Sequence, residues 1–156
     1  MYSTFFLKRE GKWLLIGGLN MIKSLKIGDS YSFNKNVEAV DVEKFADVST
    51  DHNPVHLDEE YAKTTMFKKR IAHGMLGVSY ISSILGTKFP GAGTIYLGQT
   101  VKFLAPVYLG DSLEVKAEIV DLKEGRNDKA TLRTTCTNQE GKMVIDGEAS
   151  VMLPKA

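Results

Sequence analysis

Met75-Leu76-Gly77-Val78-Ser79-Tyr80-Ile81-Ser82-Ser83-Ile84-Leu85 is apolar on almost every helical face, and this stretch decides the fold. A helix that is hydrophobic all round must be enclosed by protein, so we expect a buried helix of about three turns. Ala72-His73-Gly74 precedes it and Gly86 follows it, as is typical of a helix start and a helix end. The rest of the chain is therefore expected to pack around this helix.

Downstream of the helix, the hydrophobic period changes to strict alternation. Four alternating stretches follow one another, at residues 95–103, 113–120, 130–137 and 143–153. Turn-forming sequences near Gly110-Asp111, residues 125–127 and residues 139–141 join the four stretches, so we expect an antiparallel meander with one buried face. A long apolar helix beside such a sheet predicts an α+β fold in which the sheet wraps the helix.

Upstream of the helix, residues 31–37 predict a strand and residues 41–48 a short helix with an aspartate cap. They lead into Ser49-Thr50-Asp51-His52-Asn53-Pro54-Val55-His56-Leu57-Asp58. The residue before a proline favours extended geometry, so this stretch predicts a rigid loop. The carboxylate of Asp51 and the imidazole of His56 could together position and deprotonate a water molecule. An Asx-turn with a structural histidine is the plainer alternative.

Composition places the chain among ordinary globular proteins. Its 156 residues suffice for one domain, and 20 basic against 19 acidic residues give a net charge of +1. That balance gives no reason to expect nucleic acid or a membrane as a partner. The single cysteine, Cys136, cannot form an internal disulfide, which favours a cytoplasmic protein.

The first twenty residues stand apart from the rest. Their apolar piece, Trp13-Leu14-Leu15-Ile16, is far too short to span a membrane. Ile16-Gly17-Gly18 can be encoded by a purine-rich ribosome-binding sequence, so Met21 is a candidate natural start. Residues 1–20 would then be an upstream translated or disordered leader, with an ordered tail as the alternative. We expect residues 21–156 to form the single domain, and the leader to be dispensable.

Asp51-His52-Asn53-Pro54-Val55-His56, followed by Arg70-Ile71-Ala72-His73-Gly74-Met75, resembles the signature of the MaoC-like (R)-specific enoyl-CoA hydratases, the hydratase 2 group of the hotdog-fold superfamily. Ile95-Tyr96-Leu97-Gly98-Gln99 and Phe103-Leu104-Ala105-Pro106-Val107 recur in that family in the same order, so the likeness spans about residues 22–153. The resemblance implies a hotdog fold, in which an antiparallel sheet wraps one long buried helix.

The resemblance also implies a reaction, the reversible syn addition of water to a trans-2-enoyl-CoA to give the (R)-3-hydroxyacyl-CoA. Asp51 and His56 would hold the water and manage its proton, and the Gly74 amide would stabilise the thioester oxyanion. Asn53, His73 and Ser82 are the supporting residues that the family pattern suggests. No metal or separate cofactor is expected, because the substrate itself carries coenzyme A.

Two departures from the family pattern stand out. Thr50 occupies a position that is usually glycine, which removes backbone freedom before Asp51. Lys68 and Lys69 replace a Gly-Gly pair and form a basic triplet with Arg70. This triplet could contact the phosphates of coenzyme A, or it could be a solvated surface.

Other functions of the same fold remain open at this point. A 3-hydroxyacyl-carrier-protein dehydratase would run the reaction backwards on a protein-bound substrate. A thioesterase would direct water to the carbonyl carbon, and the Asp-x-Asn-Pro-x-His pattern favours the hydratase over it. A non-catalytic acyl-thioester binder would be expected to lack Asp51 or His56. In each case we expect a homodimer, because the family pairs its sheets edge to edge.

Overall fold

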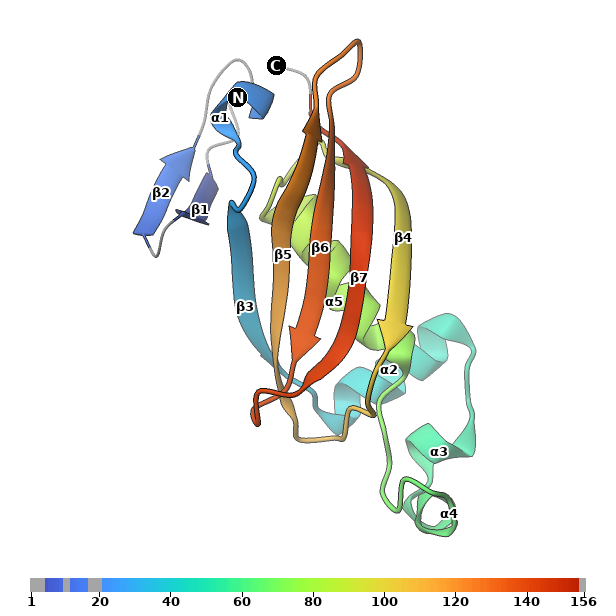
Figure 1. The fold of residues 1–156 in the computed structure, drawn as a ribbon. Coiled ribbons are helices and arrows are strands. Elements are labelled where there is room, and N and C mark those ends of the chain that lie inside the picture. Colours follow the sequence, from blue (N-terminus) through green and yellow to red (C-terminus); the bar gives the residue numbers. More distant parts are fainter. Residues whose placement is uncertain (1–4, 10–11, 17–20, 155–156) are drawn as a thin grey trace.

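The computed structural model describes residues 5–9, 12–16 and 21–154, and Figure 1 shows one antiparallel sheet curved around helix α5. The strands are β1 (Phe5–Arg9), β2 (Lys12–Ile16), β3 (Ser30–Asn36), β4 (Ile95–Phe103), β5 (Ser112–Lys123), β6 (Lys129–Thr137) and β7 (Met143–Met152). The helices are α1 (Met21–Ser24), α2 (Ala39–Ser49), α3 (Pro54–Leu57), α4 (Glu59–Thr64) and α5 (Gly74–Thr87). This is the α+β hotdog architecture that the resemblance implied.

Helix α5 is the predicted central helix, and its bounds confirm the expected start and end. Its sheet-facing side is buried, and an added Cβ on Gly77 would lie only 2.4 Å from Ile145 Cδ1 of β7. Glycine therefore lets the helix lie directly against the sheet. Met75 and Ser82 are exposed, however, so in a single chain one side of α5 stays open. The expectation of burial on every face was too strong.

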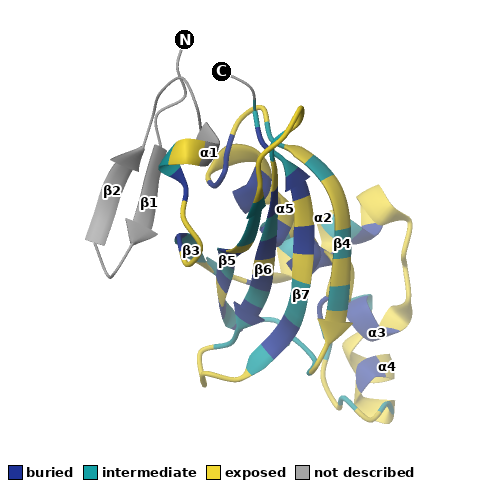
Figure 2. Cartoon of the chain, turned by 45° about the horizontal axis from the view of Figure 1, so that its top comes forward, coloured by how far each residue is buried: buried dark blue, intermediate teal, exposed yellow. Residues whose placement is uncertain are grey.

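The strands run in the order β2-β1-β3-β5-β6-β7-β4 across the sheet. Burial alternates along β5, β6 and β7, and Figure 2 shows dark blue buried positions between less buried ones on these strands. The predicted meander is correct for these three strands and wrong for β4, which pairs with β7 instead of β5. Residues 104–111 cross the end of the sheet to reach β5. Hydrophobic alternation shows which face a residue occupies, but not which strand lies beside it.

Strand β4 forms one edge of the sheet, and its burial differs from the predicted pattern. The alternating sequence predicted one buried face, but its large apolar residues Ile95, Leu97 and Phe103 are 53%, 48% and 52% exposed. A register shift lies between Tyr96 and Gly98, and such a bulge changes the side to which the following residues point. The result is an edge strand with large apolar side chains open to solvent.

The segment before α5 is more helical than expected. Residues 54–57 form α3, so His56 stands on a helical turn and not on a loop. Pro54 occupies the first turn of α3, where a proline needs no backbone N–H. Asp41 lies inside α2 as the third residue of a capping box, while Glu38 is the N-cap itself. The predicted aspartate cap was therefore placed three residues too late.

The leader and the surface add three observations. Strands β1 and β2 pair as a hairpin, and Lys8 of β1 is in register with Ser30 of β3. Residues 1–4, 10–11 and 17–20 of the leader lie outside the described residues, so its origin stays a prediction.

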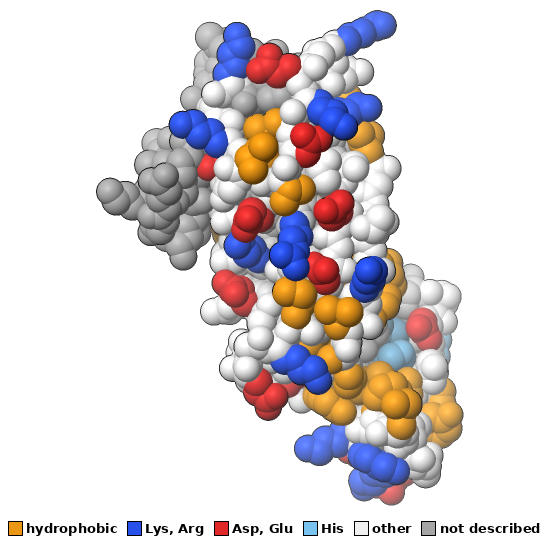
Figure 3. Space-filling model, viewed as in Figure 1, with side chains coloured by type: hydrophobic (Ala, Val, Ile, Leu, Met, Phe, Trp, Pro, Cys, Tyr) orange, Lys and Arg blue, Asp and Glu red, His pale blue; other side chains and the backbone are white. Residues whose placement is uncertain are grey.

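No helix in the described part of the chain is long and apolar enough to cross a membrane. Acidic and basic side chains are interspersed on the outer face of the sheet in Figure 3.

Candidate active site

The chain turns sharply into the site at Thr50. This residue follows the last turn of α2 and has φ 61° and ψ 15°, the left-handed conformation that glycine adopts without strain. A β-branched residue is disfavoured there because its side chain crowds its own backbone. Threonine at position 50, where the family usually has glycine, therefore strains the backbone just before Asp51.

Asp51 lies just beyond this turn and is fixed by Asn53. The Asn53 backbone N–H donates to Asp51 Oδ1 at 3.2 Å, and the Asn53 side-chain oxygen accepts from the Val55 N–H at 3.2 Å. Asn53 thereby caps α3 and ties it to the aspartate. The Asp51 side chain is 53% exposed, so its carboxylate can meet a ligand from solvent.

His56 is buried and held at both ends. Its Nδ1 lies 2.8 Å from the carbonyl oxygen of Ile71, which can only accept, so Nδ1 carries the hydrogen and Nε2 keeps a free lone pair. The Arg70 guanidinium donates through Nε to the His56 carbonyl at 2.7 Å. Burial lowers the pKa of His56 below its usual value, against an opposing effect of the Ile71 hydrogen bond. A neutral imidazole with an available Nε2 is suited to accept a proton.

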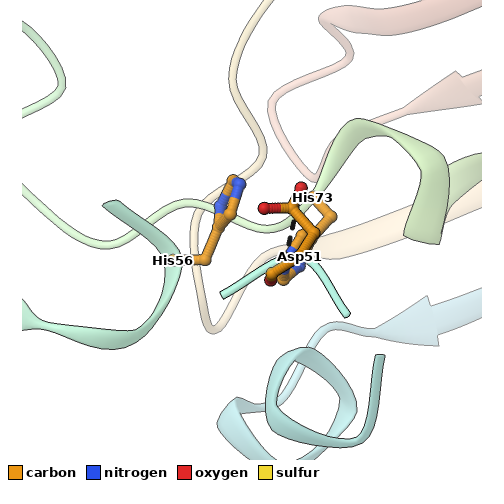
Figure 4. Close-up of side chains that lie close together, drawn as sticks. All are labelled: Asp51, His56 and His73. Carbon is orange, nitrogen blue, oxygen red and sulfur yellow. Dashed lines mark hydrogen bonds and ion pairs between the residues drawn. The ribbon is translucent and has the colours of Figure 1, made fainter. Parts of the chain in front are cut away.

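His73, the residue directly before the first turn of α5, lies close to Asp51 and His56, as Figure 4 shows. Its Nε2 lies 2.9 Å from the Asp51 carbonyl oxygen and 4.0 Å from Asp51 Oδ2. The rings of His56 and His73 have centroids 3.8 Å apart and planes inclined by 32°. A carboxylate oxygen of Asp51 and one ring nitrogen each of His56 and His73 lie within 4.8 Å of one another. These three groups could bind a water molecule, and they are also of the types that coordinate metal ions.

Helix α5 begins at Gly74, and its N-cap His73 makes no side-chain bond to the first turn. The first amide groups of a helix lack intrahelical partners and carry partial positive charge, as an oxyanion requires. A Cβ on Gly74 would lie 2.7 Å from Phe103 Cε1, so a larger residue would require the half-exposed ring of Phe103 to shift. Glycine therefore allows this ring to lie close to the helix start and leaves the backbone accessible.

A cavity of about 470 Å³ opens beside this helix start. His56, His73 and Gly74 form part of its wall. The remaining wall is mainly apolar and consists of Val37, Phe67, Ile71, Ala72, Met75, Leu76, Gly77, Tyr80, Phe103, Leu104, Ala105, Pro106, Val107, Leu113 and Ile145. An apolar cavity with two imidazoles in its wall suits an acyl chain whose reactive end must meet a polar group.

The other predicted site residues lie elsewhere. Ser82 is exposed on α5, eight residues beyond Gly74 and therefore about 12 Å further along the helix axis. Among the described residues, no hydrogen bond or ion pair joins it to Asp51. Arg70 is turned inward with its side chain only 17% exposed, and its Nη2 lies 3.9 Å from Glu43. Lys68 and Lys69 alone remain exposed, so the basic triplet is not one surface.

Sequence reasoning missed the structural role of two residues. Arg70 was predicted to form a basic triplet with Lys68 and Lys69, either as a contact of coenzyme A phosphates or as a solvated surface, although its position within Arg-Ile-Ala-His-Gly could have suggested a part in the site. Phe45 of α2 packs its ring 5.1 Å from that of His73. Nothing in the spacing of the sequence connects these two rings, because only the tertiary fold brings α2 against the start of α5.

Comparisons with known proteins agree on one family. Residues 23–141 match the family described as the MaoC like domain. The chain is 46% identical over 136 residues to an (R)-specific enoyl-CoA hydratase of Rhodospirillum rubrum, covering 87% of this chain and 93% of that protein. A solved (R)-hydratase from A. caviae, described as involved in PHA biosynthesis, superposes with a TM-score of 0.81 at 42% identity, covering 85% of this chain and 99% of that one. A mitochondrial 3-hydroxyacyl-[acyl-carrier-protein] dehydratase of Arabidopsis thaliana is 37% identical over 132 residues, covering 83% of this chain and 78% of that protein.

Proposed function

The chain belongs to the MaoC-like domain family, and on this premise we propose that it is an (R)-specific enoyl-CoA hydratase whose reacting water is held by Asp51 and His56. The reaction adds water reversibly and with syn geometry to a trans-2-enoyl-CoA. The observation that carries this proposal is that the Asp51 carboxylate lies within 4.8 Å of the neutral His56 imidazole and of His73, while His56, His73 and the helix start at Gly74 line an apolar cavity. The substrate is an acyl-CoA thioester, and it brings its own coenzyme A.

The roles follow from the groups present. As the water oxygen bonds to C3 of the enoyl group, the water proton passes to the Asp51–His56 pair. Electron density moves onto the thioester oxygen, where the amide at Gly74 stabilises the negative charge. The enolate then takes a proton at C2 from the same pair on the same face, which makes the addition syn. In this step the pair acts first as the base toward water and then as the acid toward the enolate.

A carrier-protein dehydratase is the second candidate, and the Arabidopsis relative supports it. It would use the same dyad in the direction of water loss. The two proposals differ in what carries the acyl group, not in the chemistry. The higher identity to the Rhodospirillum rubrum hydratase and the likeness to the solved (R)-hydratase favour coenzyme A.

The test is to offer crotonyl-CoA to the purified protein and follow the absorbance of its conjugated thioester. We expect the absorbance to fall and the product to be the (R)-3-hydroxybutyryl thioester. Crotonyl-carrier-protein is the matched second substrate. Faster turnover of the carrier-bound group would assign the chain to the dehydratases. No loss of absorbance with either substrate would contradict both candidates.

Lys68 and Lys69 are proposed to contact the phosphates of coenzyme A. Both side chains are exposed and line a shallow hollow with Tyr108 and Asp111, next to the segment that holds His56. Two cations at this place are suitable partners for a polyanionic ligand. Arg70 is excluded from this role, because its guanidinium bonds the His56 carbonyl.

A homodimer is proposed on the basis of the β4 edge. A strand with unpaired backbone groups and exposed apolar side chains is a template for pairing with a second copy. Helix α5 passes behind this edge of the sheet in Figure 1, and a partner at the edge would cover some of its exposed residues, such as Met75. Light scattering at micromolar concentration should give about twice the chain mass of 17.2 kDa. A mass equal to one chain would contradict the dimer.

We also propose that the enzyme works in the cytoplasm. The support is Cys136, whose thiol is free and buried and whose pKa is raised by burial to about 12. Such a thiol resists oxidation and has no partner for an internal disulfide. Activity in the cytoplasmic fraction of the source cells would support this location, and activity confined to another fraction would contradict it.

A further inference from the structure

We propose that His73 is a positioning residue that holds Asp51, His56 and the start of α5 in a single catalytic geometry. The inference deepens the proposed hydratase function and rests on it. The family pattern suggested His73 as a supporting residue without a role, whereas its contacts define one. In our proposal His73 exchanges no proton with the substrate and acts through the other residues.

The first support is the hydrogen bond to Asp51. His73 is buried, and its Nε2 donates to the Asp51 carbonyl oxygen at 2.9 Å, across 22 positions of sequence. Thr50 holds Asp51 in a strained turn, and the Asp51 side chain is half exposed. A buried donor on the carbonyl therefore fixes the backbone from which the carboxylate projects.

The second support is the stacking of rings. His73 lies between His56, at 3.8 Å between centroids, and Phe45 of α2, at 5.1 Å. Phe45 belongs to α2, the helix that leads into the Asp51 turn, and His56 belongs to α3; the rings of both contact the His73 ring. The His73 ring thus fills the space between the two elements that carry the dyad. A smaller side chain would leave His56 free to rotate about its remaining bond to Ile71.

The third support is the place of His73 in α5. It is the N-cap residue, with extended ψ of 135°, and Gly74 is the first helical residue. The proposed oxyanion site is therefore covalently joined to the residue that bonds Asp51 and stacks on His56. A displacement of His73 would move all three parts at once. Misplacement of a reacting group by about 1 Å can cost roughly a hundredfold in rate.

The chain offers variants that separate the two contacts. His73→Phe keeps a flat ring against His56 but cannot donate to Asp51. In the described part of the chain, Nδ1 of His73 has no hydrogen-bond partner, so this change removes only the Nε2 bond. His73→Gln has an amide that can donate at the position of Nε2 but has no ring. His52→Phe, one residue from Asp51 on the exposed side of the loop, is the matched control.

The experiment measures kcat and KM for crotonyl-CoA hydration, with each variant made in the wild type and in Asp51→Asn. We expect His73→Phe to lower kcat by about tenfold to a hundredfold with little change in KM, and His73→Gln to recover part of it. His52→Phe should stay near the wild type. In the Asp51→Asn background, His73→Phe should change the residual rate by less than about threefold, because groups that act as a unit fail together.

Two results would overturn the proposal. One is a full wild-type kcat in both His73 variants. The other is an undiminished effect of His73→Phe in the Asp51→Asn background, which would make His73 an independent packing residue. If His73→Phe does not fold, His73→Met, which also lacks a donor, takes its place in both backgrounds.

A second readout does not depend on turnover. The Asn53 amide donates to the Asp51 carboxylate, so its hydrogen exchange should quicken in His73→Phe and not in His52→Phe. An unchanged exchange rate would contradict the positioning role, even in a protein that proved inactive on crotonyl-CoA. Failure of the wild type in the hydration assay would instead count against the proposed function.

Discussion

The segment of residues 50–73 and the β5–β7 sheet are held in place by different forces. In the segment, Asn53, His56, Arg70 and His73 make hydrogen bonds between a side chain and a backbone group. In the sheet, the inward side chains are removed from solvent. The fully buried ones include Leu113, Val115, Ala117, Ile119, Leu132, Cys136, Ala149 and Val151. The sheet supplies stability through burial, whereas the segment supplies direction to a few polar groups.

This difference teaches where activity and stability should separate. A hydrogen bond to a half-exposed loop contributes little to the free energy of unfolding, about 1 kcal/mol, although it fixes an atom to within a fraction of an ångström. A buried leucine contributes several times more to the free energy of unfolding, but it positions no reacting group. Substitutions in the segment should therefore lower the catalytic rate more than the stability, and substitutions in the sheet should lower the stability more than the rate. The following predictions test that separation.

The largest effect on stability is expected in β6. Leu132 is fully buried against α5, and Leu132→Ala should cost about 2–5 kcal/mol through lost burial and a new cavity. Arg133, the next residue, points outward to pair with Asp146, and Arg133→Ala should cost less than about 1 kcal/mol. Urea unfolding of both variants checks the difference. Equal losses would show that burial does not distinguish the two faces of the sheet.

Thr50→Gly should stabilise the protein. Glycine accepts φ 61° without the steric cost of a left-handed residue, so the gain should be about 1 kcal/mol after the entropy of glycine is subtracted. Ser49→Gly is the control, because Ser49 ends α2 in helical geometry and should lose stability. Melting temperatures of the two variants should move in opposite directions. A loss in Thr50→Gly would show that the threonine side chain stabilises the turn.

The pH dependence follows from His56. Its pKa lies below the ordinary 6.5, mainly because of burial, so the folded protein takes up this proton at lower pH than the unfolded chain does. Its contribution to stability is then present above pH 6.5 and is lost as pH falls through the folded pKa. The rate, which needs neutral His56, should fall on the acid side with a midpoint below 6.5. Rate profiles of the wild type and melting curves of His56→Gln check both points. A rate midpoint above pH 6.5 would contradict the claim that burial lowers the pKa of His56.

Particular residues show what could be predicted from sequence. The central helix and the strand faces of β5–β7 followed from hydrophobic period and residue type, whereas the Asp51–His56 dyad was predicted from the resemblance to the MaoC-like hydratases, because spacing alone left an Asx-turn open. Local pattern could not show that β4 crosses to pair with β7, because strand order depends on a connection whose path only the folded chain fixes. It could not show that Arg70 turns inward either, because the acceptor is a backbone carbonyl fourteen residues away. The contact between Phe45 and His73 was hidden for the same reason.

The smallest effect is expected at Lys68 and Lys69. Each exposed cation should contribute less than about 1 kcal/mol to coenzyme A binding, so Lys68→Ala with Lys69→Ala should raise KM several-fold and leave kcat unchanged. The increase should shrink at high salt. Crotonyl-pantetheine, which lacks the nucleotide phosphates, is the control substrate and should not distinguish the variant from the wild type. An equal loss with crotonyl-pantetheine would place the two lysines away from the phosphates.

The most direct test of the account is to measure turnover and stability together in Asp51→Asn, in His56→Gln and in the double variant. Each single change should lower kcat for crotonyl-CoA by at least about a hundredfold, the usual size of a general acid–base contribution. The double variant should be hardly slower than either single one. All three should keep a cooperative melting transition close to that of the wild type. A folded single variant with near-full turnover would contradict the dyad, and losses of rate that track losses of stability would contradict the separation between the segment and the sheet.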